Sequence, residues 1–222
     1  MSLSQSIRHA LCGVGLIAAF GVAAVPQSAH AQGYGDTTLP SAPQSMDLKL
    51  GFRGVGEVWQ DANIIHHYRS SNFGGTGFAA YGLTNWLMME LELGYLRQSS
   101  APDRTGVASG AIELAPISLS ACARLDTSRA EVFAGLGYAM AVFTEQTDVG
   151  TISGVKPGFD IRTGVRVHTN FVQTSIRPNA APSVQGMDLE FMFGRRQHHA
   201  FGLGTGFDFS AWRVGLGLVA RL

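Results

Sequence analysis

Residues 158–170 read GFDIRTGVRVHTN, a stretch in which apolar and charged side chains alternate almost without interruption. Its apolar set is Phe159, Ile161, Val165 and Val167, and its charged set is Asp160, Arg162, Arg166 and His168. Successive side chains of an extended chain point to opposite faces, so a period of two predicts a β-strand. One face of this strand would be apolar and the other charged.

The same alternation recurs along the chain. It is clear at 46–58, 86–96, 130–145, 186–194 and 212–222, and weaker at 77–84 and 109–125, which complete a set of eight. The clear segments are nine residues or longer, whereas strands of soluble sheets most often have about five or six residues and membrane-crossing strands need about 9–11. In hydrocarbon a sheet must close on itself to satisfy its backbone. The sequence therefore predicts an all-β, eight-stranded antiparallel transmembrane β-barrel.

The connections are predicted to alternate as well. Short turns are expected near 84–86 and 126–129, and long polar loops near 59–76, 97–108, 146–157 and 195–204. Short turns at one end and long loops at the other are typical of outer-membrane barrels. The segment 169–185 is too long for a short turn, and part of it, 171–176, is expected to extend the preceding strand.

The composition fits this arrangement. Charged residues make up 14% of the 222 residues, 16 Lys and Arg balance 16 Asp and Glu, and 28 residues are Gly. So apolar a chain is not disordered, and without a basic excess it is not expected to bind nucleic acid. A soluble, lipocalin-like barrel with an apolar interior would show the same alternation, but the low charge favours apolar side chains facing lipid and glycines facing a crowded lumen.

The N-terminus is predicted to be a targeting segment. Residues 1–31 carry a short basic start, an uncharged apolar stretch and an Ala-His-Ala cleavage site at 29–31, the features of a signal peptide for Sec export. Residues 32–45 are expected to be a flexible lead-in, and 46–222 the barrel. Cys122 is then the one cysteine of the mature chain, which excludes an internal disulfide.

The charged face of the strands is the candidate functional region. Nine residues are predicted to form an ion-pair network in the lumen: Lys49, Arg53, Glu90, Glu92, Arg162, Arg166, Asp188, Glu190 and Arg213. Asp47, Arg124 and Asp160 lie on the same face. Buried charges are costly unless they are paired, so a balanced set favours a plugged lumen. The alternative is a polar path for small solutes.

Aromatic residues on the strands form a second candidate set. Those predicted to form girdles at the membrane interfaces are Trp59, Tyr81, Trp86, Tyr95 and Trp212. The alternative is that they only pack against their neighbours.

Signals for catalysis and metal binding are weak. Glu90 and Glu92 share a face, but facing basic strands they are expected to be ion-pair partners rather than an acid and a base. The pairs His66-His67 and His198-His199 could meet at the loops of the first and last strands, where four imidazoles would suit zinc or copper, yet solvated loops are the favoured interpretation. No metal or cofactor is predicted, and phosphate-binding and hydrolase motifs are absent from the sequence.

Segments such as TGFAAYGLTNWLMMELELGY (76–95), AEVFAGLGYAMAVF (130–143) and the terminal WRVGLGLVARL (212–222) resemble the small outer-membrane β-barrel superfamily of Gram-negative bacteria, which includes OmpA-, OmpX- and OmpW-like proteins. The resemblance implies a monomeric barrel in the cell outer membrane, with a structural or surface-interaction role. Its partners would be outer-membrane lipids, lipopolysaccharide and, during insertion, the barrel-assembly machinery. The family usually ends in an aromatic residue, whereas this chain ends in Leu222.

Two other functions remain open alongside this one. Similarity to the OmpW-like members allows a narrow channel for small or hydrophobic solutes. The run HYRSSN (67–72) resembles the His-x-Ser-Asn run of the outer-membrane lipid A deacylases, but it has two more residues between His and Ser. An enzyme is therefore not the predicted function.

Overall fold

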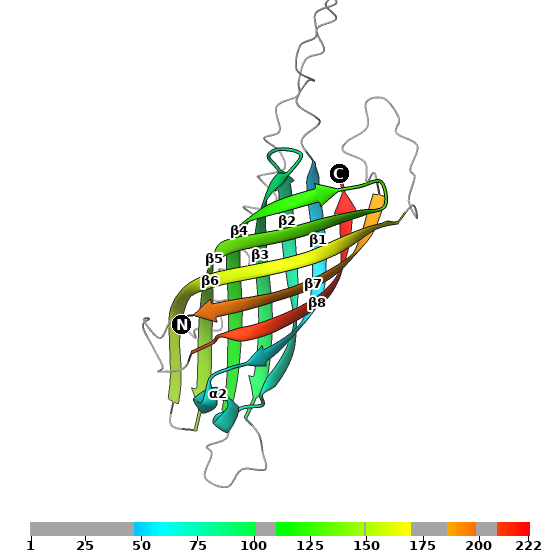
Figure 1. The fold of residues 1–222 in the computed structure, drawn as a ribbon. Coiled ribbons are helices and arrows are strands. Elements are labelled where there is room, and N and C mark those ends of the chain that lie inside the picture. The colour runs from blue at the N-terminus through cyan, green and yellow to red at the C-terminus, as the bar shows by residue number, and fades with distance from the viewer. Residues whose placement is uncertain (1–46, 101–109, 149, 170–185, 199–207) are drawn as a thin grey trace, which may run out of the picture. The chain divides into compact units, whose positions relative to one another are not determined.

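The computed structural model of this chain describes residues 47–100, 110–148, 150–169, 186–198 and 208–222. Eight antiparallel strands close into a barrel in sequence order, β8 pairing with β1 (Figure 1). The strands are β1 (Leu48–Trp59), β2 (Ser71–Gly82), β3 (Leu87–Ser99), β4 (Gly110–Asp126), β5 (Ala130–Thr147), β6 (Gly150–Thr169), β7 (Gly186–His198) and β8 (Ala211–Arg221). The predicted fold class is confirmed. The predicted signal peptide and lead-in lie outside the described residues.

The faces of the strands settle which side of the sheet is inside. Phe52 is 61% exposed on the outer surface, while its neighbour Arg53 is fully buried in the lumen. The same alternation is clear in β1, β6 and β7, with exposed Leu, Val and Phe outside and charged side chains inside. This is the inverse of a soluble lipocalin-like barrel, so that alternative is wrong.

The connection between β5 and β6 differs from the prediction. A long polar loop was expected over 146–157, but both strands continue there and pair up to Thr147 opposite Gly150. The ladder adds backbone hydrogen bonds for each residue that stays extended, which outweighs the polar composition. Gly150 has a φ of 152°, a conformation that favours glycine and allows the chain to reverse at once. The other loops are also shorter than predicted, because 71–76, 97–99 and 195–198 belong to strands.

The two described turns at the opposite end are short, as predicted. In the β2–β3 turn the Thr84 hydroxyl oxygen accepts a hydrogen bond from the backbone N–H of Leu87 at 3.0 Å. In the β4–β5 turn Thr127 accepts from the N–H of Ala130 at 3.1 Å. A threonine therefore fixes each reversal. The prediction for 171–176 lies outside the described residues.

A short helix, α2 (Ala62–His67), follows β1 at the loop end of the barrel (Figure 1). Asp61 caps it by accepting from the N–H of Asn63 at 2.7 Å, and its other carboxylate oxygen accepts from the N–H of Asp208 at 2.6 Å. Ile64 is fully buried. The helix is thus anchored to the segment before β8. No helix among the described residues is both long and apolar enough to span a bilayer.

Candidate functional site

The lumen contains one continuous network of charged side chains. Within the described residues it joins seven cations to seven anions through ion pairs of 4 Å or less. The cations are Lys49, Arg53, Arg124, Arg162, Arg166, Arg196 and Arg213, and the anions are Asp47, Glu57, Glu90, Glu92, Glu131, Asp160 and Glu190. Its net charge is zero, which a buried set of ions requires.

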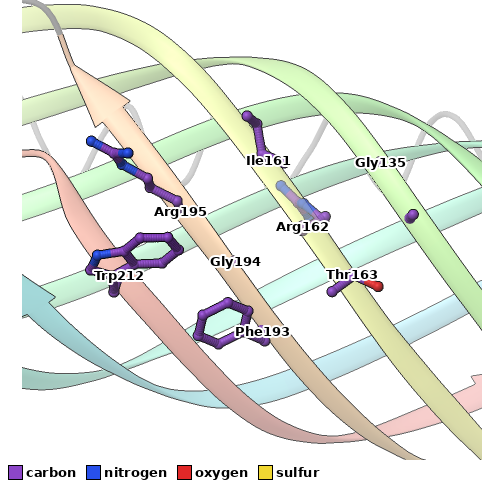
Figure 2. Close-up of a pocket in the computed structure, with 9 residues that line it drawn as sticks. Gly135, Ile161, Arg162, Thr163, Phe193, Gly194, Arg195 and Trp212 are labelled. Carbon is purple, nitrogen blue, oxygen red and sulfur yellow. The ribbon is translucent and has the colours of Figure 1, made fainter.

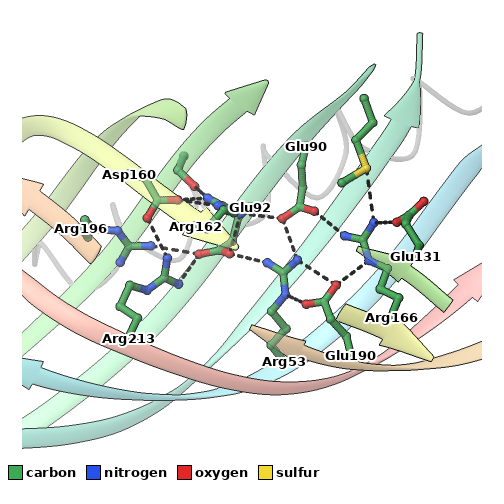
Figure 3. A network of polar contacts seen from close by, with 12 residues as sticks. Arg53, Glu90, Glu92, Glu131, Asp160, Arg162, Arg166, Glu190, Arg196 and Arg213 are labelled. Carbon is green, nitrogen blue, oxygen red and sulfur yellow. Dashed lines mark hydrogen bonds and ion pairs between the residues drawn. The ribbon is translucent and has the colours of Figure 1, made fainter. Parts of the chain in front are cut away.

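Glu90 and Glu92 of β3 lie at the centre of this network (Figure 3). Glu92 accepts from four arginines: Arg213 at 2.5 Å, Arg53 at 2.6 Å, Arg196 at 2.9 Å and Arg162 at 3.1 Å. Glu90 accepts from Arg162 at 2.5 Å and from Arg53 and Arg166 at 2.7 Å. Both carboxylates are fully buried. Arginine does not give up its proton in proteins, so these contacts favour ion pairing over acid–base catalysis.

Many of these pairs cross the lumen rather than follow the sheet. Arg162 lies on β6 and Glu90 on β3, three strands away around the barrel. Arg53 on β1 reaches both Glu90 on β3 and Glu190 on β7, neither of which is a neighbouring strand. Side chains from opposite walls therefore meet in the middle of the barrel. An eight-stranded barrel is just narrow enough for side chains to fill it.

Aromatic and polar side chains also contact three arginines of the network. Arg53 lies over the ring of Phe78 with its Cζ 3.7 Å from the centroid, and Arg166 lies over Phe133 at 4.4 Å. Arg162 donates to the Ser118 hydroxyl at 2.6 Å. Such stacking suits the planar guanidinium and stabilises it away from water.

The network ends in a smaller cluster at the turn end of the barrel. Burial raises the pKa of the Asp47 carboxyl, but Lys49 and Arg124 outweigh this effect and hold that pKa below its usual range. Asp188 is not part of the main network. It lies 3.1 Å from Nδ1 of His168 and 3.2 Å from Nε of Arg221. Its predicted location in the lumen holds, but its predicted partners do not.

At the loop end an apolar layer lies above the charges. It consists of Trp59, Ile64, Tyr68, Leu96, Ile112, Leu114, Ala141, Phe143 and Phe209. The Tyr68 hydroxyl donates to Glu145 at 2.7 Å, and burial together with this hydrogen bond raises the pKa of Tyr68 above its usual range. The charged lumen is thus separated from the loop end by packed side chains.

Trp59 corrects the girdle prediction. It is 2% exposed and packs inside the barrel, edge to face with Phe209 at 5.7 Å between ring centroids. Odd-numbered residues of β1 face inward, so its place in the alternation excludes the lipid side. Trp86, Tyr95 and Trp212 are exposed on the outer surface, and Tyr81 is partly exposed. Their depth in a membrane stays a prediction.

The histidine pairs do not come together as a metal site in the described residues. His66 and His67 lie on α2, whereas His198 is buried in the lumen with Nδ1 3.1 Å from the backbone carbonyl oxygen of Lys156. His199 lies outside the described residues. Where the structure is described, no group of three or more His, Cys, Asp or Glu side chains could hold a metal ion. In the run that resembles the lipid A deacylases, His67 lies at the end of α2 and Ser71 at the start of β2.

Three network residues were missed at the sequence level: Glu57, Glu131 and Arg196. Continuing the alternation from Arg53 places Glu57 inside, and Glu131 stands on the inward face of its segment. Arg196 was assigned to a loop, because a run of polar residues follows it. A signal for all three was present in the period of two.

Comparison with known proteins gives one family match. The family described as "outer membrane protein beta-barrel domain" matches residues 12–219. No curated protein matches the chain. Solved structures that resemble it include the N-terminal β-barrel domain of Pseudomonas aeruginosa OprF (15% identity, 78% of this chain and 97% of that chain, TM-score 0.46). Others are Yersinia pestis Ail in complex with sucrose octasulfate, a heparin analogue (11%, 80% and 97%, 0.47), and P. aeruginosa OprG (10%, 80% and 96%, 0.48).

Proposed function

Because this chain belongs to the outer membrane protein beta-barrel domain family, we propose that it is a non-conducting, non-enzymatic barrel with a structural or surface-interaction role. As an outer-membrane barrel it would place its short turns in the periplasm and its longer loops outside the cell. The loops and α2 would then form the surface that meets partners.

The observation that carries this proposal is the pairing across the lumen. Arg162 and Glu90 come from strands three apart, and both are nearly or fully buried. A solute passing through the barrel would have to separate these ions, which costs several kcal/mol per uncompensated charge. The apolar layer around Phe143 and Phe209 adds a second barrier.

Conductance in planar lipid bilayers tests the proposal. The folded full-length barrel is expected to give no single-channel current above that of protein-free bilayers. Arg162→Gln and Glu190→Gln, which each unbalance the network, serve as comparison variants. A regular current in the wild type that changes with either substitution would establish the alternative function, a narrow channel.

The proposal has three further parts. The protein would be exported through the Sec pathway, inserted by the barrel-assembly machinery, and surrounded as a monomer by outer-membrane lipids and lipopolysaccharide.

Mass analysis of lipid A from cells with and without the protein tests the absence of deacylase activity. Unchanged acylation is expected, and the loss of an acyl chain that depends on Ser71 would contradict it.

A further inference from the structure

The outer wall of the barrel carries very little charge. Among the outward-facing strand residues that the structure describes, three are charged: Arg97, Glu113 and Arg195. Arg97 and Glu113 pair across β3 and β4 at 3.6 Å. Arg195 on β7 has no carboxylate within ion-pair distance in the described part of the chain. A cation on an apolar wall with no carboxylate beside it would be stabilised by an anion from outside the barrel.

A groove lies directly beside Arg195 on this wall (Figure 2). Its volume is about 410 Å³, within the range of about 300–1,000 Å³ of ligand sites. The strand register explains it: Ala134 is opposite Thr163, and Thr163 is opposite Phe193. Two small side chains thus form a floor between larger ones. Ile161, Phe193 and Trp212 are the large apolar residues of the lining. Two arginines line it as well, but the side chain of Arg162 is buried in the lumen, so Arg195 is the charged side chain on the outer side.

Aromatic contacts hold the charged end of the groove in place. Phe193 stacks on Trp212 with ring centroids 5.4 Å apart and an angle of 18° between the planes. The guanidinium carbon of Arg195 lies 5.3 Å from the Trp212 ring centroid. One of its terminal nitrogens donates to Gln60 at 3.1 Å, and a guanidinium carries further terminal N–H donors for a ligand outside the wall. The guanidinium is therefore positioned with donor capacity to spare.

We propose that this groove binds a phosphorylated lipid A molecule of the outer leaflet. One acyl chain lies over Ala134 and Thr163, and a phosphate accepts hydrogen bonds from Arg195. The chemistry matches, because arginine binds phosphate through charge-assisted hydrogen bonds and the groove is almost entirely apolar. The position matches too, since Arg195 contacts Gln60, which directly follows β1 at the loop end. In an outer-membrane barrel this end faces the outer leaflet, where lipopolysaccharide resides.

This inference rests on the membrane orientation given in the proposed function and names one lipid site on its surface, but it does not depend on whether the lumen conducts. The competing explanation is that Arg195 only extends toward the headgroup region without selecting a lipid. That explanation predicts no preference among anionic lipids and no effect of groove shape.

Native mass spectrometry of the full-length barrel, folded in detergent micelles, distinguishes the two. The probes are diphosphorylated lipid A, phosphatidylglycerol and phosphatidylethanolamine. Arg195→Gln is expected to lower the apparent affinity for lipid A about tenfold, the effect of losing one charge-assisted contact. Arg97→Gln, which removes another outward-facing arginine of the same barrel end, should leave it within about twofold. Heat-modifiable gel migration verifies that each variant is folded.

A second pair of variants tests the acyl-chain part. Thr163→Phe fills the floor of the groove and is expected to weaken lipid A binding, while Val165→Phe adds the same ring two residues along the same face and is not. Equal effects of Arg195→Gln and Arg97→Gln would overturn the proposal. So would phosphatidylglycerol binding as tightly as lipid A, or lipid A binding that Thr163→Phe leaves unchanged.

Discussion

Replacing Glu92 by Gln tests whether the network stabilises the barrel. Glu92 accepts from Arg53, Arg162, Arg196 and Arg213 at 2.5–3.1 Å, through both carboxylate oxygens. A glutamine keeps the shape but removes one negative charge. Its amide nitrogen would also face arginine donors where an acceptor stood before. Four buried guanidinium groups would then share less negative charge than they need.

The expected loss follows from the burial of all partners. Removing one partner from a buried ion pair costs about 3–5 kcal/mol, because the remaining charge stays uncompensated. Glu113→Gln is the matched control, since the same substitution there affects a partly exposed pair with Arg97 at 3.6 Å near the loop end. Exposed pairs contribute about 0–1 kcal/mol. The two variants should therefore differ by about 3 kcal/mol in the free energy of unfolding.

Urea-induced unfolding in lipid vesicles, followed by tryptophan fluorescence, measures this difference. If Glu92→Gln does not fold, the double variant Glu92→Gln/Arg213→Gln restores neutrality and is expected to fold at least in part. A Glu92→Gln barrel within about 1 kcal/mol of Glu113→Gln would refute the reasoning. A double variant less stable than the Glu92 single variant would refute it too.

Two further predictions concern Asp47 at the turn end and Gly137, which faces the lumen. Lys49 and Arg124 lower the pKa of Asp47, so its ion pairs add about 1 kcal/mol or less to the stability of the folded barrel. This contribution is complete above the unfolded pKa of about 3.9 and disappears as the pH falls through the lower folded pKa. Asp47→Asn should therefore be less stable than wild type at pH 7 and equal to it in strong acid, and a pH-independent difference would contradict this. Gly137→Ala should cost about 1–3 kcal/mol, because a Cβ there would collide with the Leu119 backbone oxygen, whereas Gly56→Ala, with its nearest atom at 4.0 Å, should be near neutral. Equal denaturation midpoints for the two Ala variants would show that the lumen can accommodate the extra methyl group.

The residues that face the lumen could be predicted to a large extent from the alternation of side chains along each strand. In residues 158–170 a period of two separates Ile161 from Arg162, and the structure places them on opposite faces. The prediction for Trp59 was wrong because tryptophan is common at membrane interfaces, whereas its odd-numbered position in β1 directs it into the lumen. The loop expected over 146–157 was wrong because polar composition does not prevent a strand from continuing when its neighbour continues with it.

The partners of each charge could not be predicted. Asp188 was expected beside the arginines of the lumen, but it lies with His168 and Arg221. Strand pairing tells which residues are neighbours in the sheet, yet the decisive contacts join β6 to β3 and β1 to β7. These contacts depend on how far the strands are staggered around the closed barrel.

The sequence by itself determined that the chain forms eight strands with an apolar and a charged face, because side-chain direction in a strand depends only on position along the chain. Tertiary structure alone decided that Glu90 meets Arg162 across the lumen, and that Ala134 and Thr163 leave a groove beside Arg195 on the outer wall. Both depend on closure and register, which place residues far apart in sequence within a few ångströms of each other.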